Sequence, residues 1–203
     1  VSLQFMQAAV EPIKQSEEVR NFVASVTNPF LMLLVGMVLT FVLQSSTALT
    51  TILISMADVF CVSLGGNPSI TNAVLFIILG SNIGTCFTTI IASVGANTNA
   101  KRAAFLHLLF NVLGSVLFFI LLALWPDFST VTLGSWLPGK PALQIAVFHT
   151  IFNTSCTLIF LPFCNLLVKI AQLVVPDKTD NKARTTLYID ERFLATPSIA
   201  LYQ

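Results

Sequence analysis

The sequence predicts an all-α protein that is embedded in a membrane, and two observations carry this prediction. Hydrophobic residues make up 55% of the 203 residues and charged residues only 9%, whereas about 25% of residues are charged in ordinary soluble domains. Long apolar stretches follow one another along the chain, and two of them are interrupted by clusters of hydroxyl and amide side chains. We therefore expect a polytopic membrane protein that contains broken or re-entrant half-helices.

Charge and cysteine content exclude other classes of protein. The formal net charge is +1 at pH 7, and no basic run with interleaved aromatic residues occurs, so nucleic acid is not an expected partner. The four cysteines, Cys61, Cys86, Cys156 and Cys164, have neither a short metal-binding spacing nor the arrangement of a small disulfide-rich domain. We interpret them as small residues that pack within the membrane.

The chain divides into three parts by composition. We interpret residues 1–27 as the end of a preceding helix and a polar linker, residues 28–175 as the membrane part, and residues 176–203 as a soluble segment. The chain starts without a methionine and stops just after a new amphipathic stretch begins. We therefore expect it to be a fragment of a longer protein.

The first interrupted stretch contains the densest polar cluster of the chain, residues 44–51 (QSSTALTT). Its apolar flanks, residues 29–43 and 52–57, are each too short to cross a bilayer, which takes about 20 residues of helix. Asn28 and Pro29 are typical of a helix start, as N-cap and first helical residue. In lipid, a helix break is tolerated only where it is buried in protein or lines a cavity. The pattern predicts two half-helices that meet at a binding site.

The chemistry of this cluster indicates which ligands it would bind. The cluster contains no charged residue, and its amide and hydroxyl oxygens suit a hard cation such as sodium. The N-terminal ends of half-helices offer free amide N–H groups and a positive dipole end, which suit an oxyanion. Paired half-helices that supply both kinds of site are a transporter arrangement. The alternative is that these hydroxyls only satisfy helix backbone or pack against neighbouring helices.

The second interrupted stretch spans residues 70–94 and contains the motif GSNIGTCFTT at residues 80–89. Its two glycines allow a helix to relax and a ligand to approach the backbone closely. Ser81, Thr85 and Thr88 are spaced i, i+4 and i+7, so in a helix they share one face. We expect a second break here. The alternative is a close helix-packing face that is built from small residues.

The rest of the membrane part predicts ordinary helices and loops. After the first break, we expect the second half-helix to run to about residue 63 and to end at the turn residues 65–68 (GGNP), with Asp58 at the membrane interface. Residues 103–125 predict a spanning helix, and residues 142–175 predict a long helix with a kink at Pro162. Polar loops at residues 97–102 and 126–141 separate these stretches.

A His-x-x-Phe-Asn pattern occurs twice, once in each of the last two helices. It places His107 one helical turn before Asn111, and His149 one turn before Asn153. We interpret the four residues as polar stripes that hold the broken segments in place, with plain interhelical hydrogen bonds as the alternative. A catalytic role for either histidine is not expected, because no nucleophile or metal constellation accompanies it. The protein is therefore not expected to be an enzyme.

The distribution of basic residues predicts the orientation. Lysines and arginines follow the last apolar stretch, so the C-terminal segment should be cytoplasmic. Counting back, residues 126–141 face the outside and Lys101 and Arg102 face the cytoplasm. Lys14 and Arg20 suggest a cytoplasmic start, which requires an even number of crossings between Arg20 and Lys101. Either both broken segments are re-entrant hairpins, or each crosses the membrane once.

Three motifs in this order resemble the type II sodium-dependent phosphate cotransporter family. They are QSST (residues 44–47) after a half-helix that starts with Asn-Pro, GSNIGT (residues 80–85), and NAKRAAFLHLLFN (residues 99–111). The resemblance covers residues 28–175, and residues 188–197 (YIDERFLATP) look like the entry to the PhoU-like domain of the bacterial branch. The family's membrane domain has two inverted repeats, each with a Gln-Ser-Ser motif. This chain carries one such motif, so it looks like the second repeat, and the missing first repeat would be its partner.

The resemblance also implies site residues. The set that would bind phosphate and sodium is Gln44, Ser45, Ser46, Thr47, Ser81, Asn82, Thr85 and Thr88. Within this set, the sodium ligands would be Gln44, Ser45, Ser81, Thr85 and Thr88. The expected supporting residues are His107, Asn111, His149 and Asn153.

The expected function is sodium-coupled movement of inorganic phosphate across a bacterial inner membrane, with sodium as coupling ion and no other cofactor. Two other classes remain as alternatives. A structural or phosphate-signalling membrane subunit would use the same hydroxyls for helix packing. An intramembrane enzyme would need His107 or His149 beside a nucleophile or a metal.

Overall fold

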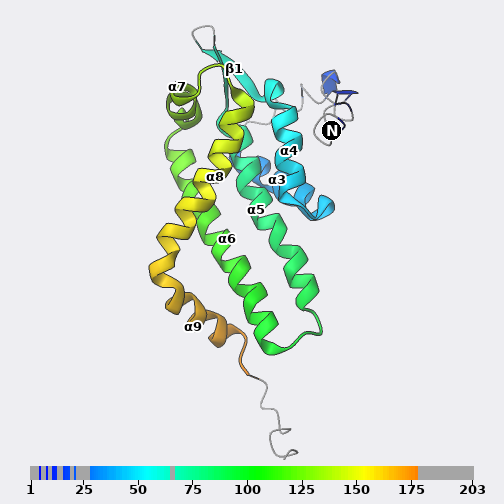
Figure 1. Ribbon diagram of the computed structural model, residues 1–203, viewed down its shortest axis with the longest axis vertical. Helices are drawn as coiled ribbons and strands as arrows, with labels where there is room; N and C mark the ends of the chain where they lie inside the picture. Colours follow the sequence, from blue (N-terminus) through cyan, green and yellow to red (C-terminus); the bar gives the residue numbers. More distant parts are fainter. Residues whose placement is uncertain are drawn as a thin grey trace, which may run out of the picture.

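The computed structural model describes residues 28–64 and 67–177, together with a few scattered positions before residue 28. The expectations for the linker in residues 1–27 and for the PhoU-like entry at residues 188–197 lie largely or wholly outside the described residues. The described part is a bundle of long helices with one small β-hairpin at its end (Figure 1). Its elements, in chain order, are α3 (Pro29–Leu43), α4 (Ser46–Ser55), η1 (Ala57–Phe60), β1 (Cys61–Leu64), β2 (Asn67–Ile70), α5 (Asn72–Ser93), α6 (Thr98–Leu124), η2 (Ser129–Leu133), α7 (Gly134–Trp136), α8 (Pro141–Phe160), η3 (Leu161–Phe163) and α9 (Cys164–Val174).

The all-α membrane class is confirmed. Three stretches are long and apolar enough to cross a membrane, Asn72–Ser93, Thr98–Leu124 and Pro141–Val174. Helix α5 is the central one, because 61% of its most apolar window is buried, against 28% for α6. The last span is interrupted by the short 3-10 turn η3, which contains Pro162. The kink predicted at this proline is therefore present, and α9 turns away from α8 (Figure 1).

The predicted break at residue 44 is also confirmed. Helices α3 and α4 are bent by 119° at this point. The Asn28 side chain accepts from the N–H groups of Phe30 (2.9 Å) and Leu31 (3.4 Å), which caps α3 as expected. Gln44 ends α3 in the left-handed conformation, with φ of 55°, and Ser45 caps α4. The chain reverses here because one residue with positive φ redirects it between two capped helices.

The predicted second break is wrong, because α5 is continuous from Asn72 to Ser93. Its glycines serve close packing against α3. A Cβ atom on Gly80 of α5 would lie 1.8 Å from the Leu33 carbonyl oxygen. In the same way, a Cβ atom on Gly36 of α3 would lie 2.0 Å from the Ile77 carbonyl oxygen of α5. Two of the hydroxyls that suggested a break donate to carbonyls of their own helix, Thr85 to Ser81 O (3.0 Å) and Thr88 to Thr85 O (2.8 Å). The glycines of this motif therefore serve helix packing, as the small-residue alternative predicts.

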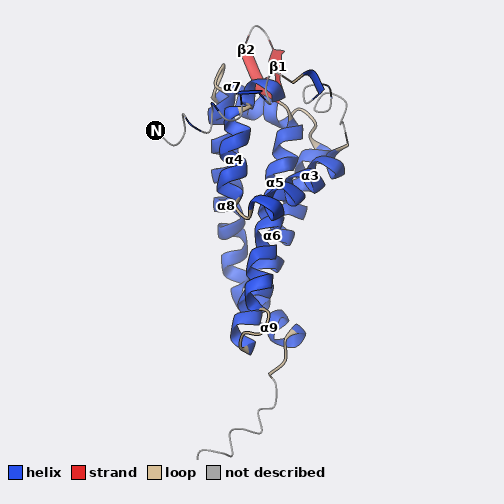
Figure 2. Ribbon diagram, turned by 90° about the vertical axis from the view of Figure 1, so that its right-hand side faces the viewer, coloured by secondary structure: helices blue, strands red, loops and turns tan. Residues whose placement is uncertain are grey.

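The region after α4 also differs from the prediction. Helix α4 ends at Ser55, not near residue 63, and the chain continues through η1 into the hairpin β1–β2 (Figure 2). Gln144 of α8 holds this hairpin, because its Oε1 accepts from Ile70 N–H (2.9 Å) and Ser69 Oγ–H (3.3 Å). Backbone groups that a helix would have paired internally are paired here across two strands. Asp58 is exposed beside the hairpin, in agreement with an interfacial position.

Cys86 and Cys156 are buried and behave as small packing residues, whereas Cys61 is half-buried and Cys164 is exposed. All four are free thiols. At the hairpin, burial and the charge of Asp58 raise the pKa of the Cys61 thiol to about 11. It is therefore protonated at neutral pH, and its Sγ–H donates to Ala57 O (3.0 Å).

The arrangement of the helices bears on the crossing number. The bent pair is either one broken span or a re-entrant loop by length and composition alone. The contacts favour the re-entrant loop, because α3 runs alongside α5 in the same direction, from the contact of Leu33 with Gly80 to the packing of Phe41 on Phe87. Helix α4 then returns to the hairpin end (Figure 1). The expectation of two re-entrant hairpins is wrong, because α5 is one continuous helix. A re-entrant α3–α4 pair gives one crossing between residues 28 and 101, and a broken span gives the two crossings that the charges predict.

The loops lie at the two ends of the bundle in the grouping that the sequence predicts, with residues 97–102 and the end of the last helix at one end and residues 126–141 at the other (Figure 1). Arg102 at the start of α6 forms an ion pair with Asp177 (3.0 Å), and its Nε–H donates to Val175 O (2.9 Å). The α5–α6 turn and the end of α9 therefore lie together, while α7 lies at the opposite end with the hairpin (Figure 1).

Candidate functional site

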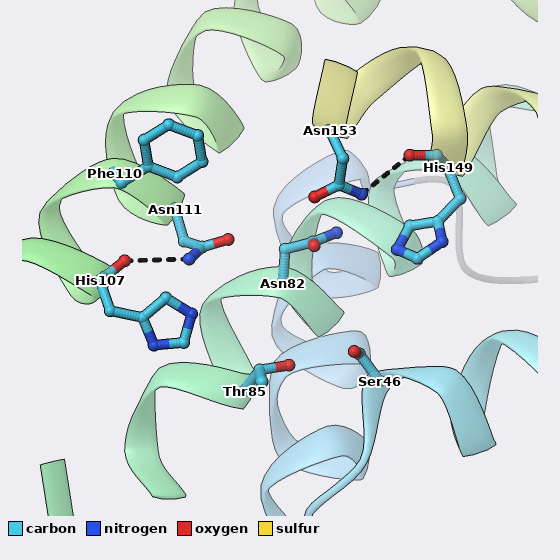
Figure 3. Close-up of a pocket in the computed structure, with 8 residues that line it drawn as sticks. All are labelled: Ser46, Asn82, Thr85, His107, Phe110, Asn111, His149 and Asn153. Atoms are coloured by element: carbon cyan, nitrogen blue, oxygen red, sulfur yellow. Dashed lines mark hydrogen bonds between the residues drawn. The ribbon is translucent and has the colours of Figure 1, made fainter. Parts of the chain in front are cut away.

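A polar cavity of about 360 Å³ lies where the break between α3 and α4 meets α5, α6 and α8. Figure 3 shows its lining as sticks. The lining residues are Ser46, Asn82, Thr85, His107, Phe110, Asn111, His149 and Asn153. The cavity therefore combines the first break, the motif of α5 and both His-x-x-Phe-Asn motifs in one place.

The start of α4 supplies Ser46 to the cavity. The left-handed Gln44 turns the chain, and Ser45 Oγ accepts from Ala48 N–H (3.2 Å). Other N–H groups of the first helical turn have no acceptor within the helix, and they carry the positive end of the helix dipole. The cavity thus receives the Ser46 hydroxyl, which lies in the first turn of α4.

Helix α5 supplies Asn82 and Thr85. Asn82 Nδ2–H donates to Ile78 O (2.8 Å), and Thr85 Oγ1–H donates to Ser81 O (3.0 Å). Both side chains are therefore anchored to the carbonyl one turn earlier. The oxygen of each remains available to a ligand.

The two His-x-x-Phe-Asn motifs line the cavity from α6 and α8. Asn111 Nδ2–H donates to His107 O (2.9 Å), and Asn153 Nδ2–H donates to His149 O (2.8 Å). All four residues, which we expected to support the broken segments, line the cavity.

The two imidazoles of these motifs are held differently. Thr89 Oγ1–H donates to Cys86 O (2.8 Å), so the contact of Thr89 Oγ1 with His107 Nδ1 (3.1 Å) makes Nδ1 the donor. This bond fixes the tautomer and the orientation of the His107 ring. The ring of His149 has no recorded hydrogen bond within the described residues and points into the cavity (Figure 3).

Five of the residues that the sequence marked as ligands lie outside the cavity lining. Gln44 and Thr47 are exposed, and Ser45 is used as the cap of α4. Ser81 is buried at the α3–α5 contact, where it accepts from Thr40 Oγ1–H (2.9 Å). The fifth, Thr88, donates to Thr85 O (2.8 Å).

Sequence reasoning missed two residues of this region. Phe110 lines the cavity, and Thr40 bonds to Ser81. Phe110 was visible as the middle of the repeated motif. Thr40 was visible as the single hydroxyl within the apolar run of α3, where a buried hydroxyl needs a partner.

The lining is polar and carries no acidic side chain. In the described residues, no group of three or more His, Cys, Asp or Glu is arranged to hold a metal ion. The cavity offers neutral oxygens to a cation, and N–H groups, imidazoles and a helix N-terminus to an anion. Such a lining suits monovalent cations and oxyanions better than divalent metals, whose sites take carboxylates.

Comparisons with known proteins agree with the motifs. A sequence model of the family described as "Na+/Pi-cotransporter" matches residues 1–135. "Uncharacterized protein YqeW" of Bacillus subtilis is 38% identical over 148 residues, which are 72% of this chain and 44% of that protein. "Putative inorganic phosphate export protein YjbB" of Escherichia coli K12 is 26% identical over 204 residues, 99% of this chain and 35% of that protein. No solved structure matches at a significant level. The chain spans less than half the length of these relatives.

Proposed function

Because this chain belongs to the Na+/Pi-cotransporter family, we propose that it takes part in sodium-coupled transport of inorganic phosphate across a bacterial inner membrane. The observation that carries the proposal is the polar cavity at the helix break, whose lining contains no acidic side chain. A buried site for an anion needs N–H and hydroxyl donors and no negative neighbours. The E. coli relative carries the name "Putative inorganic phosphate export protein YjbB", which supports inorganic phosphate as the transported anion.

In this proposal, phosphate binds at the start of α4. Ser46 and the free N–H groups of the first turn contact its oxygens, and the His149 ring points into the same cavity (Figure 3). Sodium binds through neutral oxygens of the set that the family resemblance implies, Gln44, Ser45, Ser81, Thr85 and Thr88. Each ligand offsets the charge of the other, so the binding of one raises the affinity for the other by the same factor.

The proposal also assigns the exposed residues of the break to a partner. Gln44 and Thr47 are exposed in this chain. A first inverted repeat would cover them and supply the other half of each site. A PhoU-like domain would then follow residue 176 on the cytoplasmic side.

Phosphate flux tests this function. Full-length protein in proteoliposomes should move radiolabelled phosphate when sodium is present and not when potassium replaces it. Ser46→Ala should reduce the flux strongly, because it removes a hydroxyl from the cavity. Thr150→Ala is the matched control, since this exposed hydroxyl of α8 only donates to Ala146 O (3.0 Å). Gln44→Gly removes the exposed amide without straining the left-handed backbone, and should also reduce flux.

The result that contradicts the proposal is sodium-independent flux, or no flux, from correctly inserted wild-type protein. In that case the alternative, a structural or phosphate-signalling subunit, would account for the polar residues as packing groups.

A further inference from the structure

The last apolar stretch is longer than a membrane requires. Its 34 residues, Pro141–Val174, would measure about 50 Å as one straight helix, whereas the hydrocarbon core of a bilayer is about 30 Å thick. Helix α8 has 20 residues, a length that matches this core by itself. Helix α9, which follows the turn at Pro162, is therefore not needed to cross the membrane.

The direction of α9 agrees with a position at the membrane edge. The helix crosses the end of the bundle at a steep angle to α8 and does not extend it (Figure 1). It packs against α6, and its buried residues are Leu167 and Ala171. Its C-terminal end is tied to the α5–α6 turn by Arg102, which donates from Nε–H to Val175 O (2.9 Å) and pairs with Asp177 (3.0 Å). The kink at one end and Arg102 at the other thus hold α9 across the bundle.

The exposed surface of α9 has a narrow polar stripe between apolar flanks. Asn165, Lys169 and Gln172 are exposed and are spaced i, i+4 and i+7, so they lie along one line on the side away from the buried residues. Leu166 and Leu173, on the flank of this line, are 55% and 83% exposed. Such a helix is stable where lipid headgroups meet acyl chains, because its stripe contacts the headgroups and its leucines contact the chains.

The same end of the bundle carries an excess of positive charge. Between residues 28 and 177, the basic residues are Lys101, Arg102, Lys140 and Lys169, and the acidic ones are Asp58, Asp127 and Asp177. Arg102 and Asp177 neutralise each other, and Asp58 and Asp127 lie toward the opposite end, near the hairpin and η2. No ion pair of Lys101 or Lys169 is recorded among these residues. The N-terminus of α6 adds the positive end of a helix dipole beside Lys101.

We propose that α9 is an interfacial helix and that Lys101 and Lys169 form, with the start of α6, a binding surface for the headgroups of anionic phospholipids. The lipid phosphate accepts hydrogen bonds from the ammonium groups, and the acyl chains cover Leu166 and Leu173. Lipid fits this surface better than a protein partner does, because its apolar flanks continue from a helix that spans the membrane and its unpaired charges have one sign. Basic residues beside membrane helices recognise anionic headgroups in this way.

Lipid-dependent thermal stability tests the surface. Purified full-length protein in detergent is unfolded by heat with increasing phosphatidylglycerol and, in parallel, with phosphatidylcholine of the same acyl chains. A lipid that binds the folded protein raises the melting temperature by mass action. Phosphatidylglycerol should act at the lower concentration. Lys101→Gln and Lys169→Gln should each raise its half-saturating concentration roughly fivefold, as expected for one basic residue near an anionic surface.

Lys140→Gln is the matched control. Lys140 is exposed and precedes α8 at the opposite end of the bundle, so this variant should respond to phosphatidylglycerol like the wild type. An equal response of the wild type to both lipids, or a wild-type response in Lys101→Gln and Lys169→Gln, overturns the surface.

Inorganic phosphate separates the lipid from the transported anion. The two lysines lie outside the cavity lining, so stabilisation by inorganic phosphate, and sodium-dependent phosphate flux, should be unchanged in Lys169→Gln. If this variant loses the response to inorganic phosphate as well, the lysine serves the transported anion and the lipid surface is overturned. If sodium-dependent flux is absent from the wild type, the proposed function fails while the lipid response still decides this inference.

Fluorescence quenching tests the interfacial position of α9. Leu173→Trp and Gln172→Trp are made in full-length protein whose other tryptophans are replaced by phenylalanine, and each variant is placed in vesicles of phosphatidylglycerol with brominated acyl chains. Bromine quenches a tryptophan that it contacts. Quenching should be strong at residue 173, which faces the chains, and weak at residue 172, on the polar stripe. Weak quenching at both positions would mean that a following domain or a second copy covers α9, and equally strong quenching would mean that α9 is immersed in the hydrocarbon. Either result overturns the interfacial helix.

Discussion

The two faces of α5 carry polar and small residues of similar kinds and use them in opposite ways. On the face toward α3, Gly80 and Gly84 allow backbone contact, and Ser81 accepts a hydrogen bond from Thr40. On the face toward α6 and α8, Asn82 and its neighbours anchor their hydrogens to the helix and turn oxygens to a cavity.

The difference lies in what hydrogen-bonding capacity remains after folding. The face toward α3, which we call the sealed face, uses its hydrogen-bonding groups within the protein, as buried polar groups in general must. The face toward α6 and α8, which we call the open face, retains acceptors that the protein does not satisfy. Polar residues in a membrane helix therefore point to a ligand site only where part of their capacity is left over.

The largest effect on stability is expected on the sealed face, from Gly80→Ala. The added Cβ would lie 1.8 Å from Leu33 O, and this overlap can only be relieved by separating α3 from α5. Overpacking of this kind costs about 1–3 kcal/mol and occasionally more. Thermal or denaturant unfolding in detergent measures the loss.

Gly84→Ala provides the graded comparison. Its Cβ would lie 2.6 Å from Met37 O, so the loss should be smaller than for Gly80→Ala. Equal stability of both variants and the wild type would show that α3 does not pack on α5 in this way.

A smaller effect is expected from Thr40→Val on the same face. The substitution keeps the shape and removes the donor to Ser81 Oγ, at a site where Thr40 is fully buried. Loss of one buried hydrogen bond should cost about 1 kcal/mol. The sodium dependence of phosphate flux should be unchanged if Ser81 serves packing. A weaker sodium dependence would instead place Ser81 among the ion ligands, as the family resemblance implies.

The sequence was sufficient to predict the membrane class and the first break. Asn28, Pro29 and the polar run after residue 43 are local signals, because caps and apolar length are properties of neighbouring residues. The hairpin was missed because it depends on Gln144, which lies more than seventy residues later in the chain.

The second break was predicted wrongly for a related reason. Glycine and hydroxyl residues either relax a helix or let two helices approach, and the sequence of one helix does not say which. Only the position of α3 decides this for Gly80. The cavity was predicted in part: Ser46, Asn82 and Thr85 lie where a site was expected, whereas the inward position of Asn111 and Asn153 requires three helices to converge.

The smallest effect on stability is expected on the open face, from Thr85→Val. The Thr85 hydroxyl donates to Ser81 O of its own helix, a carbonyl that also accepts the regular helical bond, so the free energy of unfolding should change by only about 0.5 kcal/mol. Sodium-dependent phosphate flux should nevertheless fall, because the variant removes an oxygen from the cavity. Unfolding and flux measured on the same preparation separate the two effects.

Thr85→Val also distinguishes a role of this hydroxyl in transport from a purely structural role. If the hydroxyl only packs helices together, Thr85→Val should lower stability or assembly and leave the half-saturating sodium concentration unchanged. Thr157→Val is the matched control, since this exposed threonine makes the same kind of bond, to Asn153 O (2.8 Å), outside the cavity lining. A loss of flux at residue 85 without one at residue 157 means that the position of the oxygen, and not the presence of a hydroxyl on a helix, determines transport.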